Sequence, residues 1–85
     1  MQNHIYYIRY ALQFADMQIP QLVSIFNTQV QCRGWSSIRA YHDQALIDEF
    51  LRRSVHTSVV TDGKTISFAH LVKYDIQGNK LVFVS

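Results

Sequence analysis

Two turn sequences in the last third of the chain constrain its fold most, because each one decides which residues of its flanking strands share a face. Asp62-Gly63 stands between Val59-Val60-Thr61 and Lys64-Thr65-Ile66, which is the pattern of a two-residue type I′ hairpin. This turn predicts the pairing of Thr61 with Lys64, and therefore that of Val59 with Ile66 and of Thr57 with Phe68.

The second turn, Asp75–Lys80, predicts a second hairpin in the same phase. Asp75 faces Lys80, a favourable cross-strand pair of opposite charges, and Val72 then faces Phe83. Together the two turns predict a three-stranded antiparallel meander with one apolar face made of Val55, Val59, Ile66, Phe68, Val72, Tyr74, Leu81 and Phe83.

Two helices are predicted before this sheet. Pro20 suits a first helical turn, and the residues after it continue with helical spacing as Leu22, Val23, Phe26 and Val30. Ser36 or Ser37 is a suitable N-cap for a second helix that runs to about Arg53. Its inward face is expected to consist of Ile38, Tyr41, Ala45, Leu46 and Phe50.

Residues 4–14 fit two structures. As a strand, their even positions form the apolar series Tyr6, Ile8, Tyr10, Leu12 and Phe14; as a helix, the stripe is Ile5, Ile8, Leu12 and Ala15. The aromatic and β-branched content favours the strand. We therefore expect a single α+β domain over residues 1–85, in the order β-α-α-β-β-β, with two helices packed on one face of an antiparallel sheet. The alternative is a winged-helix-like order, α-α-α-β-β-β.

Charged residues are scarce and unevenly placed. They make up 16% of the chain, against about 25% in an ordinary soluble domain. Residues 1–32 hold only Arg9 and Asp16, and the remaining charges lie in 33–85. Because a solvated surface normally carries mixed charges, the first 32 residues are expected to be either core or interface.

This pattern favours a small, non-enzymatic interaction module that binds a second copy of itself or another protein. Aromatic residues are enriched at interfaces, so the charge-poor segment and the residue after Gly34 supply the candidates. The expected interface residues are Tyr6, Tyr7, Tyr10, Phe14 and Trp35.

The alternative function is DNA binding, with the helix over 36–53 as the recognition helix. Its candidate nucleic-acid contacts are Arg33, Ser36, Ser37, Arg39, His42 and Lys64. The acidic residues of that helix, Asp43, Asp48 and Glu49, are assigned to a solvated face.

Other function classes lack their usual signatures. Cys32 is the single cysteine, so no internal disulfide can form, and a reducing, cytoplasmic location is expected. The start Met-Gln-Asn-His does not resemble a signal peptide, and the sequence has no apolar run long enough to span a membrane. The four histidines lack zinc-site spacing, and no nucleophile signature surrounds Cys32. No metal, cofactor or enzymatic activity is therefore expected.

Overall fold

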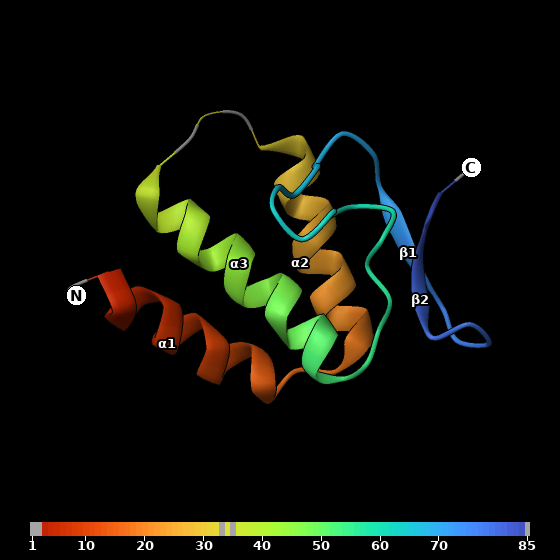
Figure 1. Ribbon diagram of the computed structural model, residues 1–85, viewed down its shortest axis with the longest axis horizontal. Coiled ribbons are helices and arrows are strands. Elements are labelled where there is room, and N and C mark those ends of the chain that lie inside the picture. Colours follow the sequence, from red (N-terminus) through yellow and green to blue (C-terminus); the bar gives the residue numbers. More distant parts are fainter. Residues whose placement is uncertain (1–2, 33, 35, 85) are drawn as a thin grey trace.

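The computed structural model describes residues 3–32, 34 and 36–84, which form three helices and a small antiparallel sheet (Figure 1). The elements are α1 (Asn3–Ala15), α2 (Ile19–Gln31), α3 (Ser37–Arg52), β1 (Val72–Asp75) and β2 (Lys80–Phe83). Helix α1 packs along α3, and α2 contacts both α3 and β1. The result is a small α+β domain. The longest helix is α3, with 16 residues, and no described helix combines the length and the apolar character that crossing a bilayer requires.

The strand expected over residues 4–14 is wrong, because this segment is helix α1. Helical spacing turns Tyr7, Tyr10 and Phe14 toward α3, where Phe14 is buried. Asn27 of α2 binds the backbone of β1 at Val72. Its side chain accepts a hydrogen bond from the Val72 amide and donates one to the Val72 carbonyl, both at 2.9 Å. The predicted order β-α-α-β-β-β is therefore incorrect in its first element.

The two predicted helices are confirmed as α2 and α3. Pro20 lies in the first turn of α2, and the Gln18 amide donates to Oε1 of Gln21 at 2.8 Å as part of a capping box. At the start of α3, Oγ of Ser36 accepts a hydrogen bond from the Arg39 amide at 3.1 Å. One residue of the expected inward face differs, since Ile38 is exposed.

The second hairpin has the predicted register, with Val72 opposite Phe83 and Asp75 opposite Lys80. The first does not: Thr61 forms a single bridge with Ile66, not a pair with Lys64. Oδ1 of Asp62 accepts hydrogen bonds from the amides of residues 64 and 65, which widens the turn to four residues.

Residues 57–60 therefore form a turn where the first strand of the meander was expected. The expected pairs of Val59 with Ile66 and of Thr57 with Phe68 are absent from the pairing that the described residues show. In place of that strand, His56 forms a single parallel bridge with Lys80, on the side of β2 away from β1.

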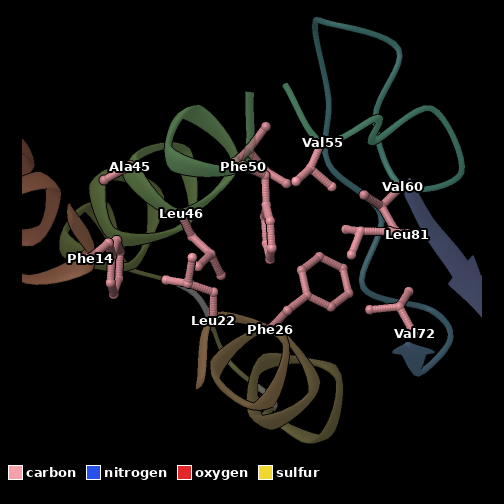
Figure 2. Packing of buried hydrophobic residues seen from close by; sticks show 11 residues of the cluster. Phe14, Leu22, Phe26, Ala45, Leu46, Phe50, Val55, Val60, Val72 and Leu81 are labelled. Atoms are coloured by element: carbon pink, nitrogen blue, oxygen red, sulfur yellow. The ribbon is translucent and has the colours of Figure 1, made fainter. Parts of the chain in front are cut away.

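The core runs through the molecule from the α1–α3 contact to the hairpin (Figure 2). Phe14, Leu22 and Leu46 fill the space between the helices, and Phe26 and Phe50 continue it toward the sheet. The segment between α3 and the hairpin closes this far end. This segment contributes Val55 and Val60 to the core, and the hairpin contributes Val72 from β1 and Leu81 from β2.

Helix α3 also buries two carboxylates, which corrects the expectation that its acidic residues form a solvated face. Asp43 is 2% exposed and Glu49 is 5% exposed. Each carboxylate pairs with an arginine: Nε of Arg39, on α3, lies 3.4 Å from Oδ2 of Asp43, and Nε of Arg53, the C-cap of α3, donates to Glu49 at 2.6 Å. Both charges are therefore paired within the fold.

The two arginines connect α3 to the ends of the other helices. Arg53 donates from Nη2 to the carbonyls of Phe14 at 2.9 Å and Ala15 at 3.3 Å, at the end of α1. Arg39 donates to the carbonyl of Gln29 at 3.0 Å, near the end of α2, and to that of Gly34 at 2.7 Å. The carbonyls of Phe14 and Gln29 also accept hydrogen bonds from the amides of Met17 and Cys32, so the arginines add a second donor to each and fix both helix ends against α3.

Glu49→Gln tests this arrangement. Hydrogen bonds from Arg52 and Arg53 lower the pKa of Glu49 against the opposing effect of burial. The ion pair therefore stabilises the fold fully above the ordinary pKa of 4.5, and this contribution is lost as the pH falls through the lowered value. Urea unfolding at pH 7 is expected to show a loss of about 2–3 kcal/mol in Glu49→Gln, because Arg53 loses its carboxylate.

The difference between wild type and Glu49→Gln should narrow when the same unfolding curves are measured near pH 3. Asp75→Asn is the matched control, since its carboxylate lies at the exposed hairpin turn and pairs across strands with Lys80. An equal loss in the two variants at pH 7 would contradict the role given to Glu49.

Candidate interaction surface

The inner face of α1 packs on α3 through aromatic side chains. The hydroxyl of Tyr7 donates a hydrogen bond to Asp48. Tyr10 and Phe14 both meet the ring of His42 edge-on, at centroid distances of 4.8 and 5.3 Å. His42 in turn lies 3.0 Å from Oδ1 of Asp43 through its Nδ1 atom. This face of α1 therefore packs against α3 within the monomer.

The outer face of α1 consists of Ile5, Ile8, Leu12 and Ala15, at the spacing that keeps residues on one side of a helix. All four are exposed: Ile5 by 54%, Ile8 by 43% and Leu12 by 66%. A surface helix normally has one apolar face, directed at the core, and a polar face opposite. Helix α1 instead has two apolar faces, and the fold covers one of them.

An open hollow adjoins this outer face. Tyr6, Tyr10 and Leu12 contribute its wall on α1, and Ile38 contributes from the start of α3. The two charged residues of the segment, Arg9 and Asp16, also border it. In the described part of the chain neither of them forms an ion pair. The hollow extends the exposed apolar surface from α1 to Ile38, which is 44% exposed.

The predicted interface residues lie in different environments. Phe14 is in the core, Tyr7 and Tyr10 are half-buried against α3, and Tyr6 is exposed beside the hollow. Trp35 is outside the described residues. The exposed aliphatic residues of the outer face were not among the predicted interface residues. Their signal was nevertheless present, as the stripe that residues 4–14 form when they are read as a helix.

Those predicted nucleic-acid residues that the structure describes do not form one exposed basic face. Arg39 is engaged with the carbonyls of α2 and the α2–α3 connection, and its guanidinium lies 5.5 Å from the ring centroid of Phe68. Ser36 is the N-cap of α3. His42 is half-buried between the aromatic residues of α1.

Of the remaining nucleic-acid candidates, Ser37 is exposed at the start of α3, and Lys64 is exposed in the turn that follows Asp62. Arg33 is outside the described residues. A second hollow at the junction of α2 and α3 is lined by Cys32, Ser36, Arg39 and His42 among others. The Cys32 thiol is exposed there. In the described residues, no three potential metal ligands lie together.

Comparison with protein-family models, with curated proteins and with solved structures gives no match for this chain. No similarity therefore assigns a role to any residue, and we infer a function from the geometry of the chain itself.

Tyr7→Phe tests the polar contact that holds α1 on α3. The hydrogen bond to Asp48, together with burial and the negative charge of Asp48, raises the pKa of Tyr7 from 10.0 to about 12. The protonated form is the one that binds, so its stabilisation is present below pH 10 and is lost as the pH rises toward 12. We expect Tyr7→Phe to lower the free energy of unfolding at pH 7 by about 1–2 kcal/mol.

Tyr6→Phe is the matched control, because its hydroxyl is on the same helix but on an exposed side chain. Unfolding curves in urea at low protein concentration should separate the two variants at pH 7, and the deficit of Tyr7→Phe should shrink above pH 10. Indistinguishable curves for the two variants at pH 7 would show that the bond to Asp48 contributes nothing to stability.

Proposed function

We propose that this chain is a small, non-enzymatic interaction module that associates with a second copy of itself through the outer face of α1. The observation that carries the proposal is the second apolar face of this helix, with Ile5, Ile8 and Leu12 exposed while the opposite face is packed on α3. Apolar surface of this kind is stabilised when it is removed from water.

The charge distribution supports the same proposal. Arg9 and Asp16 are the only charged residues in the first 32, so the α1 surface carries no net formal charge. Charged residues are depleted at the centre of interfaces, whereas an ordinary solvated helix face is rich in them. A surface that is apolar and electrically neutral is suited to a partner with the same properties, and a second α1 has them. The single cysteine agrees with a reducing, cytoplasmic setting.

The size of the surface sets the expected affinity. Thirteen helical residues extend about 20 Å. A stable interface usually buries about 800 Å² on each partner, more than the exposed side chains of so short a helix supply. The hollow toward Ile38 adds area, but the association is expected to be weak, with a dissociation constant of about 1–100 μM.

Leu12→Glu tests the proposal in sedimentation velocity runs from 1 to 500 μM. Wild type is expected to shift from monomer to dimer across this range. Leu12 is more exposed than Ile5 and Ile8, so the new carboxylate does not disturb the core but would be buried in the dimer. We expect association to weaken about 30-fold or more, while the urea unfolding curve of the monomer stays unchanged.

Ile76→Glu is the matched control, because Ile76 is 78% exposed at the hairpin turn, at the opposite end of the molecule from α1 (Figure 1). It should dimerise as wild type does. A wild-type protein that remains monomeric up to 500 μM, or equal weakening by the two substitutions, would contradict self-association through α1.

The second candidate function, DNA binding, is supported by one observation. Residues 3–15 form a helix, which gives the order helix, helix, helix, hairpin that the winged-helix-like alternative requires. The engagement of Arg39 with backbone carbonyls counts against it, because a recognition helix needs free side chains near its N-terminus. Asp43, near the start of α3, also pairs with Arg39, so that guanidinium group is already neutralised within the fold.

Duplex DNA titrations at 50 and 200 mM salt distinguish the two functions. If the chain binds only itself, the fluorescence anisotropy of a labelled duplex should not change at either salt concentration up to 50 μM protein. Binding at 50 mM salt that weakens at least tenfold at 200 mM, and that Lys64→Ala reduces, would support the DNA-binding function instead.

A further inference from the structure

We propose that the two α1 helices of the self-associated form run antiparallel across a twofold axis, with Arg9 of each copy facing Asp16 of the other. This arrangement rests on the proposed function and specifies its geometry. It is carried by two features of the outer face of α1: the order of its apolar residues and the position of its two charges.

The apolar residues of the outer face are spaced symmetrically along the helix. The steps from Ile5 to Ile8, Leu12 and Ala15 are three, four and three residues, so the series reads the same from either end. Its centre is at Tyr10. An antiparallel pair centred there places Ile8 against Leu12 of the second copy, and Ile5 against Ala15. In a twofold interface such exchanged pairs occur twice.

The two charges decide between the antiparallel and the parallel arrangement. Arg9 and Asp16 are seven residues apart, which places them two turns apart on nearly the same side of the helix axis. Both border the hollow beside Leu12. They therefore lie on one flank of the outer face, with the positive charge near the middle of α1 and the negative charge just beyond its end.

A twofold axis perpendicular to the two helices brings equivalent flanks together, as in antiparallel coiled coils. The flank with Arg9 and Asp16 then faces the same flank of the second copy with its direction reversed, and two pairs of opposite charges form. In a parallel pair this flank would face the opposite flank, which carries neither residue. The antiparallel arrangement alone therefore matches the charges.

The register follows from the same residues. With the pair centred at Tyr10, Arg9 and Asp16 of the second copy are offset by five residues, about 7.5 Å along the axis. The long side chain of Arg9 spans this offset, so the charges pair while Ile8 stays opposite Leu12 of the second copy. Asp16 lies one residue beyond the end of α1, so its carboxylate is not confined to the helix surface.

Charge exchange tests the proposal in sedimentation equilibrium at 50 mM salt. Arg9→Asp leaves two acidic flanks and Asp16→Arg leaves two basic ones, so each variant alone is expected to dimerise about tenfold more weakly than wild type. An equimolar mixture of the two should form a heterodimer about as tightly as wild type. The double variant, with the charges exchanged, should also recover wild-type self-association.

Lys73→Asp is the matched control for charge alone, since it makes the same change as Arg9→Asp on the exposed side of β1. It should dimerise within twofold of wild type, and it should form a heterodimer with Asp16→Arg more weakly than Arg9→Asp does, because only one of the two charge pairs is then attractive. Unfolding curves of the monomers check that each variant folds. Wild-type levels of dimer in both single variants, or a double variant as weak as either, would overturn the antiparallel arrangement while leaving self-association intact. A monomeric wild type would overturn both.

Discussion

The arrangement of the helices depends on two arginines of α3, each of which binds the end of another helix. Arg53 reaches the carbonyls at the end of α1, and Arg39 reaches one near the end of α2. A half-buried arginine is costly without a counter-charge, and the buried carboxylates of Asp43 and Glu49 on α3 supply one for each guanidinium group. Helix α3 therefore carries both the cations and the anions that this joint requires. Helices α1 and α2 need only present their terminal carbonyls, which every helix has. This division of roles allows the first 32 residues to be almost free of charge and still be fixed in place.

Because these cations are used inside the fold, they do not form a surface for an anionic partner. The outer face of α1 presents exposed apolar side chains, with Arg9 and Asp16 on one flank. The charge deficit of the first 32 residues thus has two sources. Part of it belongs to the core, where Phe14, Leu22 and Phe26 are buried, and part belongs to the outer face of α1, which the chain itself does not cover. The buried apolar residues stabilise the monomer, whereas the exposed ones on the outer face of α1 would be stabilised only by contact with a partner.

The parts of the fold that could be predicted from the sequence are those whose residues act locally. Pro20 and Ser36 determine where α2 and α3 begin, and the pair Asp75–Lys80 determines the register of the second hairpin. Residues 4–14 were predicted as a strand and are a helix, because their apolar residues fit both structures and the choice depends on distant groups. The same holds for the first turn, where the hydrogen bonds of the Asp62 side chain widen the loop. The burial of Glu49 could not be predicted from its neighbours in the sequence, because a glutamate close to Arg52 and Arg53 is typical of a solvated helix face.

The candidate surface was hidden by the same ambiguity. Reading residues 4–14 as a strand places Ile8, Leu12 and Phe14 on one face, whereas the helix separates Phe14, which is buried, from Ile8 and Leu12, which are exposed. A helix that is apolar on two sides has more apolar surface than a domain of 85 residues can bury, because small domains cover a smaller fraction of their surface than large ones. A larger domain could cover such a helix with further elements. Here α2, α3 and the hairpin pack around one core, which leaves the outer face of α1 as the surface that we propose a second copy covers.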